Sequence, residues 1–167
     1  RFYFLKNEGT LLELAVMRYA LDFLMNRGFT PLTVPVLVRE HAMMGTGYFP
    51  GGEDQAYKMK DDDLYLVGTA EVSLASYHYD EILDKSHLPI KSVAWSNCFR
   101  REAGTYGKDT HGLYRIHQFM KVEQVIVMEE DDEKSLKMLD YLLNNATDFL
   151  QSLNIPYQVV AVCSGDM

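Results

Sequence analysis

The sequence has little cysteine, no long uninterrupted hydrophobic run and no surplus of positive charge. Its two cysteines, Cys98 and Cys163, lie far apart and outside any CxxC pair, which argues against a disulfide framework and against a zinc site. We therefore expect both to be small buried apolar residues in a reducing compartment. The most apolar stretch near the N-terminus, residues 11–25, is interrupted by charged residues, so it predicts neither a membrane span nor a signal peptide.

Acidic residues outnumber basic ones. Twenty-four Asp and Glu stand against sixteen Lys and Arg, which gives a net charge of −8. This balance argues against a surface that binds nucleic acid over its whole extent, because phosphate contacts need clustered Lys and Arg. A length of 167 residues suits one domain with its own core, and we expect a cytoplasmic protein. The chain begins with Arg and ends just after a strand-like run, so we expect a piece of a larger protein.

Helical and extended patterns alternate along the chain. Residues 10–28 form a predicted helix, with a Thr-x-x-Glu capping box at its start and Gly28 as its stop. This helix has few polar residues, so we expect a partner subunit to cover part of it. Residues 29–38 have the valine and threonine content of a strand, and Pro31 and Pro35 restrict that strand to an edge or an interface.

Turn residues and hydrophobic periodicity predict the remaining elements. They are a hairpin over 55–68, a helix over 69–83, a long hairpin formed by 92–102 and 113–128, a helix over 129–153 and a last strand over 155–164. A glycine-rich loop, residues 45–52, has Pro50 where a dinucleotide-binding fingerprint needs glycine. The order of elements predicts an α+β fold with a mainly antiparallel sheet flanked by helices.

One stretch, residues 99–123, is basic although the chain is acidic. Its positive residues are Arg100, Arg101, Lys108, Arg115 and Lys121. If its two strands present the same face, the face carries Arg100, Glu102, Arg115, Phe119 and Glu123. Guanidinium groups pair with phosphate oxygens and an aromatic ring stacks on a purine, so this platform fits a nucleoside triphosphate, over which we expect the loop 103–112 to close. The alternative is a surface strand with cross-strand Arg–Glu pairs, each worth about 0.2–1 kcal/mol.

The same stretch resembles a motif of a known family. Phe-Arg-x-Glu at 99–102, followed after a loop by Arg115 and Phe119, is similar to motif 2 of the class II aminoacyl-tRNA synthetases. "RGFTPLTVPVLV", after a long helix, resembles the dimer-forming motif 1, with Pro35 at its marker position. "GTGYFP", "GTAEV" and "KVEQ" resemble the seryl branch of the family. The resemblance covers nearly the whole chain, with motif 1 at about 10–39 and motif 2 at about 93–123.

This resemblance implies a class II catalytic fold, incomplete at its C-terminal end, and a set of residue roles. The implied ATP-binding residues are Arg100, Arg101, Glu102, Arg115, Ile116 and Phe119, of which Arg100 and Glu102 are the implied catalytic ones. The implied serine-binding residues are Thr69, Ala70, Glu71, Arg100 and Glu123. Arg100 would hold the α-phosphate, Phe119 would stack on adenine and Arg115 would steer the γ-phosphate. Thr69, Glu71 and Glu123 would grip the ammonium and hydroxyl of L-serine.

The resemblance also implies parts that lie outside these residues. Residues 1–167 match neither motif 3 nor the helical arm that grips tRNA(Ser), and they do not include the family's ligands of the catalytic Mg²⁺. We therefore expect no metal site in this chain. The implied function is activation of L-serine with ATP to seryl-adenylate, then transfer of serine to tRNA(Ser) by an intact homodimer. Two alternatives stay open. One is a related enzyme that activates an amino acid for a carrier protein, and the other is a dimerising module without turnover.

Overall fold

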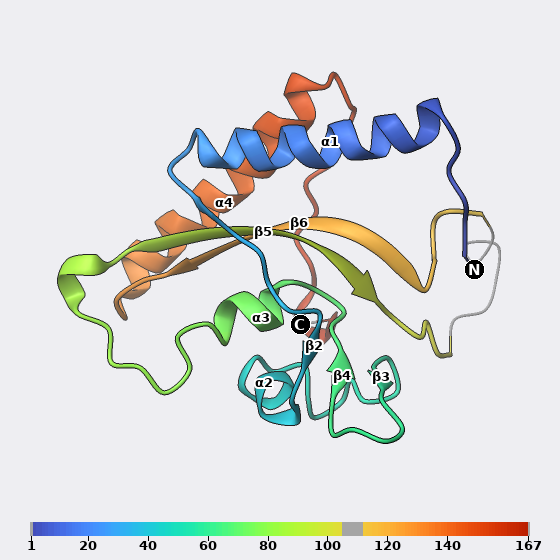
Figure 1. The fold of residues 1–167 in the computed structure, drawn as a ribbon. Helices are drawn as coiled ribbons and strands as arrows, with labels where there is room; N and C mark the ends of the chain where they lie inside the picture. The colour runs from blue at the N-terminus through green and yellow to red at the C-terminus, as the bar shows by residue number, and fades with distance from the viewer. Residues whose placement is uncertain (1, 105–111, 167) are drawn as a thin grey trace. The chain divides into compact units, whose positions relative to one another are not determined.

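A long antiparallel hairpin is the centre of the fold (Figure 1). The computed structural model describes residues 2–104 and 112–166 and divides into two units, Arg1–Glu129 and Glu130–Met167. The main sheet of the first unit has the order β1-β5-β6. Its strands are β1 (Thr30–Leu32), β5 (Ile90–Phe99) and β6 (Gln118–Val127). β5 and β6 pair antiparallel over ten residues each, and β1 joins β5 in parallel.

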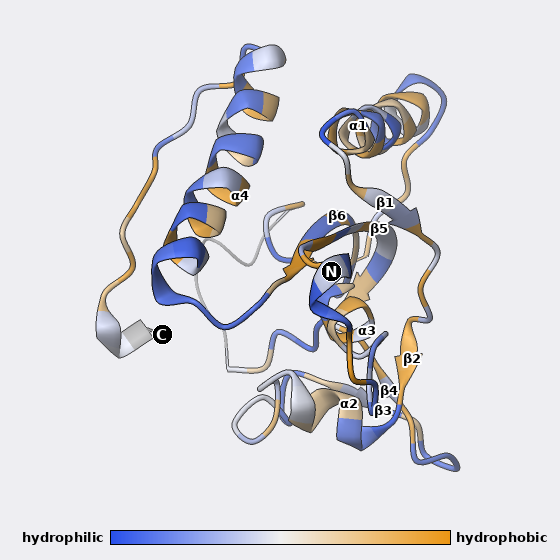
Figure 2. Cartoon of the chain, turned by 90° about the vertical axis from the view of Figure 1, so that its left-hand side faces the viewer, coloured by the Kyte–Doolittle hydropathy of each residue, from blue (hydrophilic) through white to orange (hydrophobic). Residues whose placement is uncertain are grey.

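A second, smaller antiparallel sheet has the order β2-β4-β3. Its strands are β2 (Leu37–Val38), β3 (Tyr57–Lys58) and β4 (Tyr65–Leu66), and α2 (Glu40–Gly45) packs beside them. Farther along the chain come α3 (Glu71–Ala75) and the 3-10 turn η1 (Lys85–His87), which precedes β5. Met43, Phe49 and Val67 are buried in the hydrophobic core of the smaller sheet. Figure 2 shows hydrophobic residues along β2 and around α3. Three of the four strand pairings are antiparallel, which confirms the predicted α+β class with a mainly antiparallel sheet.

Two helices cover the two faces of the main sheet (Figure 1). α1 (Glu8–Met25) contacts β5 and β6 on one face. α3 contacts the same strands from the other face, where Ala70 and Leu74 pack with Ala94. The Thr10–Glu13 capping box predicted for α1 is wrong, because the helix begins two residues earlier and Asn7 is its N-cap. The C-terminal end of α1 agrees with the prediction that Gly28 stops the helix. Gly28 has φ +84°, a left-handed conformation that glycine adopts without strain.

Three predicted elements form only in part, one of them the strand expected over 113–128, which is β6 from Gln118 to Val127. The single strand expected over 29–38 is instead two strands, β1 and β2, which belong to different sheets. Pro35 lies between them and has no N–H with which to continue a ladder. The helix expected over 69–83 is only α3, because the residues after Ala75 form turns and Asp80 takes φ +61°. Tyr77 and Tyr79 are exposed, so little apolar burial supports a longer helix.

The second unit contains a long amphipathic helix and an extended tail. α4 (Asp132–Ser152) was predicted, and its N-cap Asp131 accepts a hydrogen bond from the Lys134 N–H at 2.9 Å. Figure 2 shows its hydrophobic and hydrophilic residues on different sides of the helix. The strand predicted over 155–164 is wrong for the described residues, where the tail pairs with no strand before the 3-10 turn η3 (Ser164–Asp166). Of the helices that the structure describes, none is long and apolar enough to cross a membrane.

The two cysteines have opposite surroundings. Cys98 on β5 is fully buried, as predicted, whereas Cys163 is exposed, so the prediction of burial is wrong for Cys163. Burial raises the pKa of the Cys98 thiol, and the hydrogen bond with Ser96 and the nearby charge of Lys121 offset this only in part. Since the thiolate is the reactive form, Cys98 combines low access with a low thiolate fraction at neutral pH.

We expect Ellman's reagent to modify Cys163 rapidly in the folded protein and Cys98 only as the protein unfolds. The measurement is the time course of thiol release with and without denaturant. A Cys163→Ser variant should show no rapid phase. Rapid modification of Cys98 in the folded variant would contradict the burial described here.

Tyr48 packs its ring and hydroxyl against Gly68, the residue before Thr69. A Cβ added at Gly68 would collide with the Tyr48 hydroxyl and lie 3.1 Å from the ring carbon that bears it. The half-buried Tyr48 ring cannot move aside as a flexible side chain would, since it also packs against the core around Met43 and Phe49. Burial raises the pKa of the Tyr48 hydroxyl, and the positive charge of Arg100 opposes this effect.

Gly68→Ala should therefore lower the free energy of unfolding by about 1–3 kcal/mol, the usual cost of overpacking. Tyr48→Phe in the same chain should recover part of that loss, because it removes the atom nearest to the new methyl group. Denaturant unfolding of the two single variants and the double variant measures this. An alanine at 68 that costs nothing would show that Tyr48 is free to shift.

Candidate active site

The pairing of β5 with β6 puts three functional side chains on one face. Phe119, Lys121 and Glu123 lie opposite Cys98, Ser96 and Ala94 in the ladder. Alternate residues of a strand point to the same side, so these three side chains share the face that α3 covers. Arg100 follows β5 and continues its pairing, since its N–H donates to the His117 carbonyl at 3.0 Å. Of the predicted shared face, Arg100, Phe119 and Glu123 are present, whereas Arg115 lies before β6, which begins at Gln118, and Glu102 lies beyond the end of β5.

A cleft of about 450 Å³ opens where the hairpin strands end, a volume typical of small-molecule sites. Its lining residues are Arg100, Glu102, Leu113, Tyr114, Arg115, Ile116 and Phe119. The Arg100 guanidinium carbon lies 5.5 Å from the centre of the Phe119 ring, a cation–π arrangement. Arg115 Nη1 forms an ion pair with Glu102 Oε2 at 3.2 Å. The cleft therefore offers two guanidinium groups, an aromatic ring and a carboxylate to one ligand.

Gln55 holds the backbone on both sides of Glu102. The Gln55 side chain donates to the Ala103 carbonyl at 3.0 Å and accepts from the Ala103 N–H at 3.2 Å. Its own carbonyl accepts from the Arg101 N–H at 2.9 Å. Between these bonds Glu102 has φ +50°, a left-handed conformation that is uncommon for a residue other than glycine. No sequence pattern pointed to Gln55, because its partners lie 46 and 48 residues away along the chain.

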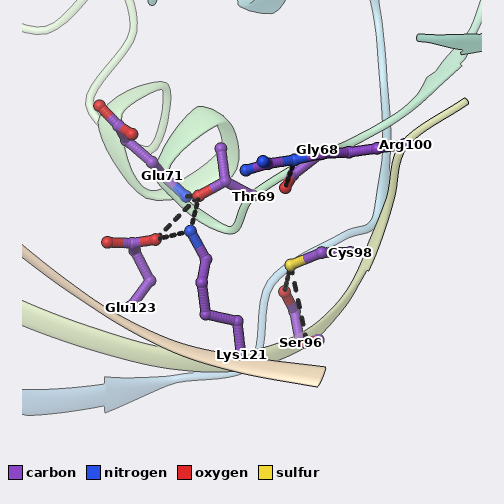
Figure 3. A network of polar contacts seen from close by, with 8 residues as sticks. All are labelled: Gly68, Thr69, Glu71, Ser96, Cys98, Arg100, Lys121 and Glu123. Atoms are coloured by element: carbon purple, nitrogen blue, oxygen red, sulfur yellow. Dashed lines mark hydrogen bonds and ion pairs between the residues drawn. The ribbon is translucent and has the colours of Figure 1, made fainter. Parts of the chain in front are cut away.

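A second cluster lies beside the first and contains Thr69, Glu71, Lys121 and Glu123 (Figure 3). The Thr69 hydroxyl donates to Glu123 Oε2 at 2.8 Å and accepts from Lys121 Nζ at 2.7 Å. Lys121 also forms an ion pair with Glu123. The Glu71 N–H donates to the same hydroxyl at 3.2 Å, so Thr69 begins a turn and is not the N-cap of α3. The family resemblance implies no binding role for Lys121, which is one of the positive charges of residues 99–123.

Arg100 joins the two clusters. Its Nε donates to the Gly68 carbonyl at 3.4 Å, next to Thr69, while its guanidinium lies over Phe119. Figure 3 shows the Arg100 side chain reaching past Gly68 toward Thr69. A ligand in the first cleft and a small molecule at the second cluster would therefore both meet this one guanidinium.

Other residues of the predicted site lie elsewhere. Arg101 lines a different cleft with Glu53, Tyr57 and Lys58, so the geometry does not join it to Arg100 and Phe119. Ala70 is fully buried and can meet a ligand only through its backbone. Lys108 and most of the loop 103–112, predicted to close over a ligand, lie outside the described residues.

Comparison with known proteins agrees with this geometry. Residues 57–167 match the family model of the tRNA synthetase class II core domain (G, H, P, S and T). The whole chain is 47% identical to the serine–tRNA ligase of Deinococcus radiodurans and 48% identical to that of Pyrococcus furiosus. It spans only 39% and 36% of the length of these two relatives.

Solved structures show the same likeness. Seryl-tRNA synthetase from Pyrococcus horikoshii, in complex with ATP, superposes with a TM-score of 0.92 at 48% identity, over 99% of this chain and 36% of that one. The cytoplasmic serine–tRNA ligase of Naegleria fowleri, in complex with AMP, gives 0.94 at 38% identity, over 100% and 39%. The family model alone covers more than half of the chain. The chain belongs to the class II tRNA synthetase core-domain family, that of the glycyl, histidyl, prolyl, seryl and threonyl enzymes.

Proposed function

We propose that the chain holds the ATP and serine sites of an enzyme that activates L-serine as seryl-adenylate and then transfers serine to tRNA(Ser). The observation that carries this proposal is that the Arg100 side chain reaches both the cleft of about 450 Å³ and the polar cluster around Thr69. The serine–tRNA ligases to which the chain is similar support the choice of amino acid. The relatives solved with ATP and AMP support the choice of nucleotide.

ATP binding is assigned to the cleft at the end of the hairpin. Phe119 offers an apolar ring on which adenine stacks, and the backbone at Ile116 lies at the same cleft. Arg100 and Arg115 meet the phosphates, because guanidinium groups stay charged and match phosphate oxygens with two parallel bonds. Glu102, held by its ion pair with Arg115, orients the adenine or the α-phosphate region. Arg101 belongs to this group only by family resemblance, since it lines another cleft.

Serine binding is assigned to the second cluster. The segment Thr69–Glu71 forms one side and Glu123 the other, with the Arg100 guanidinium within reach of the serine carboxylate. A site built from buried hydrogen-bonding groups rejects an amino acid that lacks the hydroxyl far better than apolar contacts could. Thr69 is 6% exposed, so an unmatched polar group there would cost binding free energy.

The position of the Arg100 guanidinium supports the following reaction. A carboxylate oxygen of serine attacks the α-phosphorus of ATP, the bond from that phosphorus to the bridging oxygen of the β-phosphate breaks, and pyrophosphate leaves. The attacking carboxylate is already ionised, so no general base is needed. Arg100 neutralises charge that builds on the α-phosphate oxygens in the transition state. Positioning and charge stabilisation are thus the two contributions of this chain.

Magnesium and cellular location complete the proposal. Mg²⁺ assists adenylation in the family by neutralising phosphate charge. Within residues 2–104 and 112–166, no group of three or more His, Cys, Asp or Glu side chains gathers where a metal could sit, so we assign it no ligand here. We propose a cytoplasmic location, which the cytoplasmic relative from Naegleria fowleri supports.

Arg100→Ala should lower serine-dependent ATP–pyrophosphate exchange by about 10²–10³-fold, the usual cost of removing one charge-stabilising donor. Exchange is measured with this chain alone and with a longer protein that contains it and has the length of its relatives. Threonine and alanine replace serine as controls for the amino acid.

Lys137→Ala is the matched control variant. It also removes a cationic side chain that contacts a neighbouring group, Glu133 at 3.1 Å, but on the exposed surface of α4. Its exchange rate should equal that of the unchanged protein. A full-length protein that shows no serine-dependent exchange would refute the proposed function, and equal losses in both variants would refute the role of Arg100.

We further propose that two copies associate through α1. The helix exposes Leu11, Leu12 and Leu14 at 67%, 66% and 42%, an unusual density of apolar surface for one helix. The resemblance of this helix and of β1 to motif 1 supports the same assignment.

Leu12→Glu should convert the dimer to a monomer in sedimentation velocity, because it places a charge where an apolar contact is expected. Ile82→Glu makes the same chemical change at a fully exposed site outside α1 and should leave the dimer intact. A monomeric unchanged protein at micromolar concentration would refute the proposal.

A further inference from the structure

The Thr69 hydroxyl has no hydrogen-bonding capacity left. A hydroxyl can donate once and accept twice. The Lys121 ammonium and the Glu71 N–H can only donate, and both donate to Thr69 Oγ1, at 2.7 and 3.2 Å. The ionised Glu123 carboxylate can only accept, so the single Thr69 proton goes to Glu123 Oε2 at 2.8 Å. The direction of every bond in this cluster is therefore set by the chemistry of the partners.

From this closed arrangement we infer that Lys121 is a positioning residue of the proposed serine site, and that Thr69 acts with it and does not bind the amino acid through its hydroxyl. Lys121 contacts both Thr69, which precedes α3, and Glu123, which lies on β6 (Figure 3). It thereby fixes two side chains from different elements in one arrangement. The inference deepens the proposed function and rests on it.

The substrate ammonium then goes to the carboxylates. Both contacts of Glu123 use Oε2, so Oε1 is the atom that can meet an ammonium from the ligand. Figure 3 shows the Glu71 carboxylate on the same side of Thr69 as that of Glu123. Two carboxylates against the one ammonium of Lys121 leave a single net negative charge, which matches one α-ammonium.

The rival possibility is that Lys121 merely occupies the place of the substrate ammonium and is expelled when serine binds. That exchange would replace one ammonium by another on the same two acceptors, so these contacts would contribute little net binding energy. The two possibilities predict opposite effects when Lys121 is removed.

The test compares Lys121→Met, Thr69→Val and the double variant in serine-dependent exchange by the full-length protein. Each single variant should raise the KM for serine about tenfold or more and leave the KM for ATP within about twofold, since charge-assisted hydrogen bonds are lost only at the serine site. The KM for serine of the double variant should not exceed the larger of the two single-variant values, because the two residues act as a unit. Thr69→Ser keeps the hydroxyl and should recover most of the affinity for serine that Thr69→Val loses.

Lys137→Met is the matched control, because Lys137 also pairs with a glutamate, Glu133 at 3.1 Å, but on the exposed surface of α4. A lower or unchanged KM for serine in Lys121→Met, beside a normal Lys137→Met, overturns the inference and leaves the proposed function standing. Absence of exchange in the unchanged protein refutes the proposed function instead.

In the protein that shows exchange, ¹⁵N NMR of the lysine ammonium groups tests the inference without a rate measurement. The Lys121 signal should shift in Thr69→Val and persist when serine is added. Loss of that signal on adding serine would favour displacement and overturn the inference.

Discussion

The register between β5 and β6 is the constraint on which the rest depends. It places Cys98 opposite Phe119 and Ala94 opposite Glu123, and so fixes which side chains face α3. A slip of one residue would turn Phe119, Lys121 and Glu123 to the face that α1 covers. Buried Ala94 and Cys98 oppose such a slip in β5, since it would bring the larger side chains of Trp95 and Phe99 into their place. The same apolar packing that stabilises the sheet therefore also assembles the site.

Long elements with strong periodicity could be predicted from the sequence. The hairpin, α1 and α4 each contain enough apolar residues at regular spacing for the strand or helix period to be recognised in the sequence. The arginine and phenylalanine spacing at 100, 115 and 119 predicted one cleft, because these residues lie at or near the ends of β5 and β6 that one connection joins. Predictions that depend on local chain geometry thus agree with the structure, including the edge position of Pro31.

Contacts between distant segments could not be predicted in the same way. Gln55 and Lys121 matter through partners 48 and 52 residues away, and no periodicity reports such a distance. The stretch after Ala75 has a helical pattern, but its tyrosines are exposed and the helix stops. The run 155–164 has strand-like composition, yet a strand also needs a neighbour with which to exchange hydrogen bonds. Arg101, next to Arg100 in sequence, points to another cleft because successive residues of an extended chain alternate.

The one-way hydrogen bonds at Thr69 have a consequence for inhibitor design. An inhibitor group aimed at that hydroxyl meets neither a free proton nor a free lone pair, whatever its own chemistry. Affinity can be gained there only by breaking a charged contact first, which costs more than a new neutral bond returns. Compounds that extend instead between the carboxylates of Glu71 and Glu123, or along Arg100 toward Phe119, would add contacts and break none.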